Sequence, residues 1–68
     1  MSLSVVLQGS PTELEDGISL ADLIIQLGLT GRRMAVEINA ELVPRSLHAD
    51  TLLKAGDHIE IVHAIGGG

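Results

Sequence analysis

The residue types that most often carry catalysis or bind metals are few in this chain and widely spaced. His48, His58 and His63 are the only candidate general bases. His58 and His63 are five residues apart on one predicted strand, so they project to opposite faces and do not suit one metal ion. Asp57 follows Gly56 in a predicted turn, where a carboxylate is common. We therefore expect surface histidines, no bound metal and no catalytic site within the chain.

The run Gly66-Gly67-Gly68 at the C-terminus is the other feature that suggests chemistry. A phosphate-binding glycine loop leads into a helix N-terminus, and no residue follows these three, so we do not expect one. Two interpretations stay open on these residues alone. One is a flexible end, the usual state of terminal glycines. The other is a functional tail, because glycines without a Cβ can thread an extended backbone through a narrow channel and present the terminal carboxylate.

Composition limits the classes of partner. The chain has 68 residues, which is enough for one small domain, and 46% of them are hydrophobic, which is too many for a disordered tail. Four Lys and Arg against nine Asp and Glu give a net charge of −5. This balance argues against nucleic acid and anionic membranes and favours a basic patch on a protein partner. Without Phe, Trp or Tyr there is no stacking platform for bases.

Residue usage also predicts the compartment. The absence of cysteine excludes disulfides, a thiolate zinc site and a cysteine nucleophile. A small secreted domain usually needs disulfides, so a reducing setting is favoured. The segment 1–4 lacks the basic start of a signal peptide, and no apolar run reaches the ~20 residues that span a bilayer. We expect a cytoplasmic protein that is monomeric when free.

Hydrophobic periodicity predicts an α+β roll. Alternating apolar residues predict five strands, over 3–8, 12–15, 34–38, 41–43 and 58–64. A helix is predicted over 20–27, with Ser19 as its N-cap, Asp22 completing a capping box and Gly28 ending it. A single helical turn is expected near 46–49. The order β-β-α-β-β-β implies one sheet with one helix on one face.

The same alternation separates a core from an outer sheet face. The predicted core residues are Leu3, Val5, Leu23, Ile24, Leu27, Val36, Ile59 and Ile61. Val6, Ala35 and Val62 are predicted on the face without the helix, where Glu37 and Glu60 add negative charge. This face is either a surface for docking a partner or an ordinary mixed sheet surface, and the sequence leaves both interpretations open.

Three segments together resemble a known family. They are Ser19-Leu20-Ala21-Asp22-Leu23-Ile24, then Ala35-Val36-Glu37-Ile38-Asn39 with Val43-Pro44-Arg45, and Leu53 to Val62 leading into Gly66–Gly68. In order and spacing they are similar to the ThiS family of sulfur carriers, which has the ubiquitin-like β-grasp fold. The resemblance covers most of the chain and implies a β-grasp domain over 1–65 and a glycine tail over 66–68. Gly66 is one glycine more than the family's usual terminal pair.

The resemblance also implies a mechanism. A ThiF-like adenylating enzyme uses ATP to activate the carboxylate of Gly68, and a cysteine desulfurase or rhodanese-like protein supplies sulfur. The resulting thiocarboxylate on Gly68 passes its sulfur to a ThiG-like thiazole synthase, which builds the thiazole of thiamine. Gly66 and Gly67 would let the tail enter both active sites. The chain would be a protein co-substrate that holds no cofactor, and not an enzyme.

Three other functions remain open at this point. The molybdopterin-synthase small subunit is a similar di-glycine sulfur carrier, although those chains are generally longer and contain aromatic residues. A protein modifier would join its glycine terminus to lysines of a target. A non-covalent β-grasp interaction module would not use its glycines at all.

Overall fold

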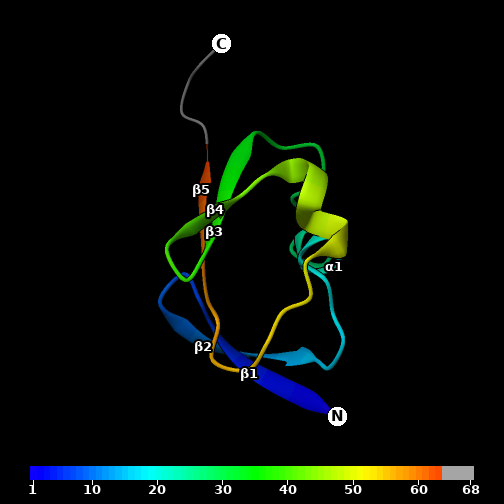
Figure 1. Cartoon of the computed structure of the whole chain (residues 1–68), viewed down its shortest axis with the longest axis vertical. Helices are drawn as coiled ribbons and strands as arrows, with labels where there is room; N and C mark the ends of the chain where they lie inside the picture. The colour runs from blue at the N-terminus through cyan, green and yellow to red at the C-terminus, as the bar shows by residue number, and fades with distance from the viewer. Residues whose placement is uncertain (64–68) are drawn as a thin grey trace.

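The computed structural model describes residues 1–63; residues 64–68, and with them the boundary predicted between a domain over 1–65 and a tail over 66–68, lie outside the described part. Its elements are β1 (Ser2–Leu7), β2 (Ser10–Glu15), α1 (Leu20–Gln26), β3 (Met34–Ile38), β4 (Glu41–Val43), the 3-10 helix η1 (Arg45–Asp50) and β5 (His58–His63). The predicted order of five strands and one α-helix is confirmed (Figure 1). The turn predicted near 46–49 is a longer 3-10 helix.

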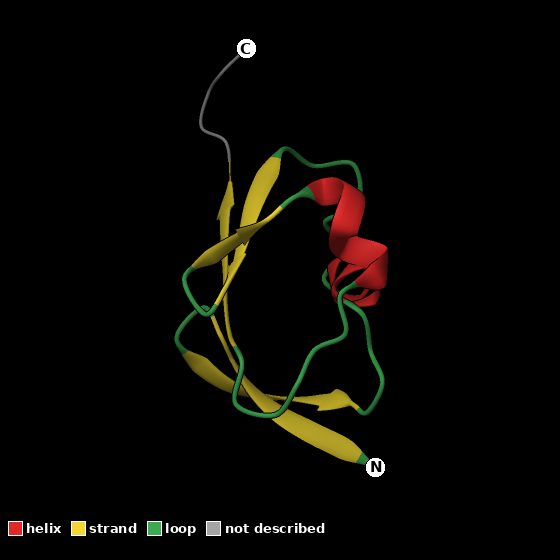
Figure 2. Ribbon diagram, viewed as in Figure 1, coloured by secondary structure: helices red, strands yellow, loops and turns green. Residues whose placement is uncertain are grey.

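The five strands form one mixed sheet in the order β2-β1-β5-β3-β4. Neighbouring strands are antiparallel except β1 and β5, which are parallel. The last strand therefore lies between the two hairpins and joins them into one sheet. Figure 2 shows α1 on one side of this sheet, with the other face left uncovered. This is the α+β roll that the sequence predicts.

Local backbone chemistry accounts for the ends of these elements. The hydroxyl of Ser19 accepts from the N–H of Asp22 at 3.1 Å, and the Asp22 carboxylate accepts from the N–H of Ser19 at 3.3 Å. This is the predicted capping box. At the other end of α1, the N–H groups of Gly28 and Leu29 donate to Ile25 and Ile24, each at 3.0 Å. With φ of +71° at Gly28, these bonds make a Schellman motif, which ends the helix.

Two hairpins turn through residues with positive φ. Gln8 and Gly9, with φ of +51° and +80°, connect β1 and β2, so β1 ends one residue before the predicted strand over 3–8, and β2 begins two residues before the predicted strand over 12–15. Pro11 belongs to β2, an edge strand, where a missing N–H is tolerated. Asn39 and Ala40 connect β3 and β4 in the same way, with φ of +53° and +68°.

The core lies between α1 and the sheet and is wholly aliphatic. Its buried members are Leu3, Val5, Leu14, Ile18, Leu20, Leu23, Ile24, Val36, Leu53, Ile59 and Ile61. The prediction is wrong for Leu27, which is 40% exposed. The helix ends at Gln26, and Leu27 is its C-cap: its N–H still donates to the carbonyl of Leu23 at 3.0 Å, and the chain turns away at Gly28, where φ is +71°.

The histidines divide between surface and interior. His58 and His63 are exposed, as predicted. His48 is buried, which corrects the expectation for this residue. Its Nε2 lies 3.1 Å from the carbonyl oxygen of Val43 and so ties η1 to the end of β4. Among residues 1–63, no cluster of His, Asp or Glu side chains is placed to hold a metal ion. No helix in that range is long and apolar enough to cross a bilayer.

Candidate functional site

The predicted reactive tail follows β5, the strand at the centre of the sheet. β5 is paired on both sides, with β1 and with β3, so its position is fixed by both hairpins. The last described residue is His63, opposite Met34 at the start of β3. Gly66, Gly67 and Gly68 lie outside the described residues. The described part of the site is therefore the base of the tail and the sheet face beside it.

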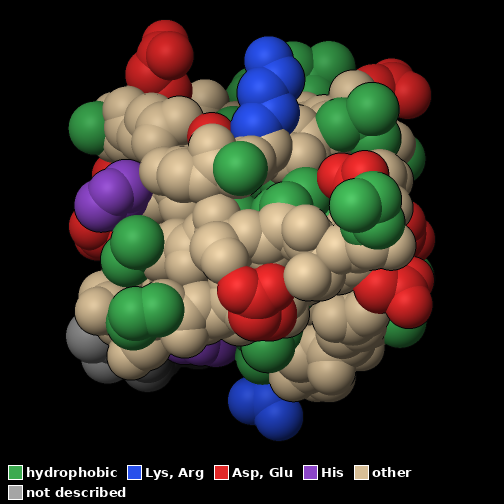
Figure 3. All heavy atoms as spheres, turned by 90° about the horizontal axis from the view of Figure 1, so that it is seen from below, with side chains coloured by type: hydrophobic (Ala, Val, Ile, Leu, Met, Phe, Trp, Pro, Cys, Tyr) green, Lys and Arg blue, Asp and Glu red, His purple; other side chains and the backbone are tan. Residues whose placement is uncertain are grey.

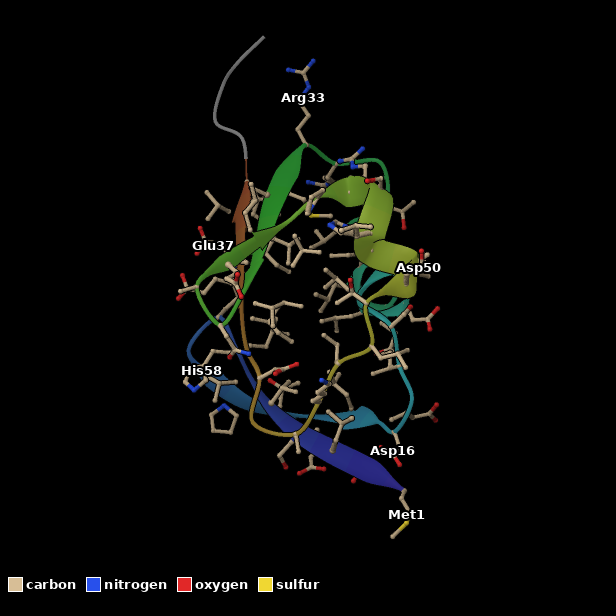
Figure 4. All side chains as sticks on the ribbon, in the orientation of Figure 1. Met1, Asp16, Arg33, Glu37, Asp50 and His58 are labelled. Atoms are coloured by element: carbon tan, nitrogen blue, oxygen red, sulfur yellow. The ribbon has the colours of Figure 1, made fainter. Side chains whose placement is uncertain are left out.

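All five residues predicted on the outer face lie there. Cross-strand partners share a face of a sheet. Ala35 is opposite Val62, and Glu37 is opposite Glu60, between β3 and β5. Val6 on β1 is opposite His58, two residues before Glu60. Figure 4 shows the labelled side chains of Glu37 and His58 on the side of the sheet away from the helix. Alternation predicted the face correctly because each strand is regular over this stretch.

The structure adds two apolar residues to this face. Leu42 on β4 is opposite Glu37 and is 64% exposed, and Pro11 on β2 is opposite Val6. Val62, near the end of the central strand β5, is 57% exposed. Leu42 was missed because β4 has only three residues, too few for alternation to show. The two-residue turn at Asn39-Ala40 is the signal that would have placed Leu42 opposite Glu37.

The pair Glu37 and Glu60 puts two carboxylates side by side at the middle of this face. Glu37 is half-buried and Glu60 is exposed. Like charges directly opposite one another destabilise an antiparallel pair. The fold gains nothing from this arrangement, whereas a cationic group of a partner would remove the repulsion on binding. The pair gives the middle of this face a concentration of negative charge, which a cationic group could neutralise.

A network of polar side chains fixes the start of β5. The Asp57 carboxylate accepts from the N–H of Lys54 at 2.9 Å and from Nδ2 of Asn39 at 3.0 Å. Oδ1 of Asn39 in turn accepts from the N–H of His58 at 3.0 Å. The N–H of Asn39 donates to the carbonyl of His58 at 2.8 Å. These bonds connect the β3–β4 turn to the turn before β5.

Gln8 fixes the other end of the contact between β1 and β5. The backbone pairing of these strands stops at Leu7 and Ile59, because β1 turns away at Gln8. The side-chain amide of Gln8 then continues the pairing. Its Nε2 donates to the carbonyl of Ile61 at 2.9 Å, and its Oε1 accepts from the N–H of Ile61, also at 2.9 Å. Ile61 is thus held by the side chain of Gln8 on the β1 side, while β3 pairs with it on the other side.

Comparison with known protein families identifies the family of this chain. The model of the ThiS family matches residues 5–68, which includes the three terminal glycines. The chain belongs to the ThiS family. Its resemblance to that family and its ubiquitin-like β-grasp fold are confirmed.

Solved structures of the same family have the same fold. The crystal structure of the thiamine biosynthesis protein ThiS from Geobacter metallireducens superposes with a TM-score of 0.83 at 25% identity, covering 97% of this chain and 100% of that one. The solution structure of a thiamine biosynthesis protein from the same organism gives a TM-score of 0.78 at 25% identity, covering 97% and 88%.

Curated relatives are similar over almost the whole chain. A thiazole synthase of Magnetococcus marinus is 38% identical over 66 residues, and one of Paramagnetospirillum magneticum is 36% identical over 66 residues. Each match covers 97% of this chain and 20% of the relative, so the chain spans about a fifth of their length. The uncharacterized protein ycf40 of Porphyra purpurea is 33% identical over 67 residues, and the match covers 94% of it.

The residues that carry the ThiS resemblance in the described part have structural tasks. Asn39 and Asp57 belong to the network at the start of β5. Nη2 of Arg45 donates to the carbonyl of Arg32 at 2.9 Å and ties the start of η1 to the loop before β3. Ser19 caps α1. In this ThiS-family chain they hold the fold that presents the tail.

Proposed function

We propose that the C-terminal carboxylate of Gly68 carries sulfur as a thiocarboxylate for the thiazole of thiamine. The observation that carries this proposal is that the ThiS match runs through the terminal glycines, over residues 5–68. The likeness to ThiS structures supports it. A carboxylate is a poor electrophile, so its conversion needs a leaving group, and the chain must meet an enzyme that supplies one.

The steps balance as two displacements and one reduction. A carboxylate oxygen of Gly68 attacks the α-phosphorus of ATP on an adenylating enzyme, and pyrophosphate leaves. The terminal sulfur of a protein persulfide then attacks the carbonyl carbon, and AMP leaves. A thiol cleaves the S–S bond of the resulting acyl disulfide, forming a disulfide and releasing the thiocarboxylate. The chain contains no cysteine, so no thiol of its own can attack the activated terminus.

The acceptor of the sulfur is a thiazole synthase in this proposal. Two relatives named thiazole synthase each contain a segment similar to nearly all of this chain. That similarity supports a close working relation between a ThiS-like domain and a thiazole synthase. Gly66 and Gly67 allow the tail to enter both active sites, since a Cβ at these positions would meet the walls of a narrow channel.

The outer face, formed by Val6, Ala35, Glu37, Glu60 and Val62, is the docking surface in this proposal. Its apolar residues supply contact area, and the Glu37–Glu60 pair selects a cationic partner. Glu60→Lys should slow association with the adenylating enzyme, and the effect should shrink as salt is added. Asp50→Lys is the matched control, because it changes the net charge equally on the helix side of the molecule (Figure 4). Equal slowing by both variants would argue against a specific face.

The deciding experiment measures the intact mass of the chain after incubation with ATP, the adenylating enzyme and a sulfur source. We expect one terminal oxygen to be exchanged for sulfur, and the exchange to disappear when Gly68 is deleted. Gly67→Ala should slow the exchange while leaving the thermal midpoint unchanged. No mass change with demonstrably active enzymes would refute the proposal. Covalent adducts to other proteins would instead identify a protein modifier.

A further inference from the structure

Positive charge is concentrated at one end of this acidic chain. Only four residues are Lys or Arg, and three of them, Arg32, Arg33 and Arg45, are exposed at the end of the molecule where β5 finishes. Met34 is opposite His63, so Arg33 flanks the point at which the chain leaves the sheet. Figure 4 shows the Arg33 side chain extending from this end, opposite Met1. The fourth cation, Lys54, lies in the turn before β5, at the other end of that strand.

Contacts between η1 and the loop before β3 hold these arginines close together. The guanidinium of Arg45 donates to the carbonyl of Arg32 at 2.9 Å, so η1 and the loop before β3 bring the two residues together. Arg33 and Arg45 also line one shallow hollow, whose remaining wall is formed by Met34, Ala35, Val62 and His63. Ala35 and Val62 belong to the outer face. Arg33 and Arg45 therefore form one continuous surface with the outer face at the end of β5, and Arg32 lies next to it.

We propose that Arg32, Arg33 and Arg45 form a basic collar that binds carboxylates at the mouth of the channel through which the adenylating partner receives the tail. This inference rests on the proposed function, because it needs the tail to enter an active site. The guanidinium fork matches a carboxylate in two-point contacts, and the apolar residues of the hollow add contact area. The fitting partner surface is an acidic rim beside apolar residues.

The anion that binds the collar could be a carboxylate of the partner protein or the phosphates of ATP, and the length of the tail favours the carboxylate. Five residues follow His63, and an extended chain covers at most about 3.6 Å per residue, so the reacting carboxylate lies up to about 18 Å beyond the end of β5. With the tail extended in a channel, the collar stays at the entrance while the carboxylate meets ATP. The collar therefore faces the partner's surface, not its nucleotide.

The collar and the Glu37–Glu60 pair together set the orientation in which a partner protein approaches this chain. Glu37 and Glu60 present negative charge on the sheet face, and the collar presents positive charge where the tail begins. At the opposite end, carboxylates are spread over the surface (Figure 3). Opposite charges on adjoining surfaces steer a partner into one orientation more strongly than net charge does. Consider a partner with a basic patch beside an acidic channel mouth. Its basic patch can contact the Glu37–Glu60 pair while its acidic mouth contacts the collar only when the tail points into the channel.

The test is ATP–pyrophosphate exchange by the adenylating enzyme, measured against chain concentration at several salt concentrations. The variants are Arg33→Gln and the double variant Arg32→Gln/Arg33→Gln. Lys54→Gln is the matched control, since it removes one charge at the other end of β5. Arg45 is left intact because its side chain also supports the Arg32 loop. We expect KM for the chain to rise by up to about 5-fold for each arginine at low salt, and to approach the wild-type value at high salt.

Each outcome decides the question. A rise confined to the arginine variants, with unchanged thermal midpoints and unchanged KM for ATP, supports the collar. An unchanged KM for the double variant, or an equal rise for Lys54→Gln, overturns it and leaves the proposed function standing. A rise in KM for ATP also overturns it, because the arginines would then contact the nucleotide. No exchange with the wild-type chain and an active enzyme overturns the proposed function together with the collar.

Discussion

Replacing Asn39 tests whether a residue that carries the family resemblance serves stability or partner contact. Asn39→Ala removes the acceptor for the N–H of His58 and the donor to Asp57, each bond being 3.0 Å long. It also places alanine at a φ of +53°, which asparagine tolerates better. The structure therefore predicts a less stable protein whose docking surface is unchanged.

The size of the loss follows from these two effects. Each exposed hydrogen bond contributes at the lower end of the usual range, so two bonds account for about 1 kcal/mol. The left-handed backbone adds about 1 kcal/mol for alanine. A chain of 68 residues has a total stability of about 3–10 kcal/mol, so a loss of about 2 kcal/mol is a large share of it. The thermal midpoint should fall by roughly 8–16 °C.

The assay must follow backbone structure, because the chain has no Phe, Trp or Tyr to report unfolding by fluorescence. Far-ultraviolet circular dichroism in a urea series gives the free energy of unfolding. Asn39→Gly is the matched control: it loses the same bonds without the strain of positive φ, and should be about 1 kcal/mol more stable than Asn39→Ala. Well below its thermal midpoint, Asn39→Ala should be adenylated with an unchanged KM. A stability loss under about 0.5 kcal/mol, or a raised KM in a fully folded variant, would refute the structural role.

Three further predictions concern other parts of the fold. Gln8→Ala removes both side-chain bonds to β5, so the free energy of unfolding should fall by about 1–2 kcal/mol and amide exchange near the end of β5 should accelerate. Ala40→Gly relieves a φ of +68° and should stabilise the chain by about 0.5–1 kcal/mol in the same urea series. Hydrogen bonds from the hydroxyls of Ser4 and Ser2 lower the pKa of Glu13 below its ordinary value of 4.5. Since the folded pKa is the lower one, this stabilisation is present above pH 4.5 and is lost as pH falls through the folded pKa, so Glu13→Gln should flatten the acid side of a pH–stability curve.

Local patterns were enough to predict most of the elements. The capping box at Ser19 and Asp22 and the stop at Gly28 depend on residues within one or two turns of the chain, so the sequence contains all the information they need. Alternation placed the outer face for the same reason. Leu27 shows the limit of periodicity: the apolar spacing continues into the C-cap, but the helix ends there and the Leu27 side chain stays 40% exposed.

Burial in irregular segments could not be predicted in this way. Leu53 lies outside the α-helix and strands, and it is buried because its segment packs against the one before α1, with the N–H of Leu53 donating to the carbonyl of Ile18 at 3.0 Å. His48 is buried because η1 folds back against the end of β4. Such contacts join residues far apart in sequence, and no local periodicity reports them. The grouping of Arg32, Arg33 and Arg45 has the same origin.

The position of β5 links these structural details to the proposed sulfur transfer. A carrier must deliver its terminal carboxylate to an active site while its body rests on the outside of the partner, so the start of the tail must hold a fixed place relative to the docking surface. Asn39 and Asp57 fix the beginning of β5, and Gln8 fixes the strand close to its end. Changes at these three residues should therefore alter the folded fraction and leave KM untouched. Changes at Ala35, Val62, Arg32 or Arg33 should alter KM and leave stability nearly unchanged, because those side chains are exposed and lie outside the core. A variant of either group that moved both quantities together would show that support and docking are not separate in this fold.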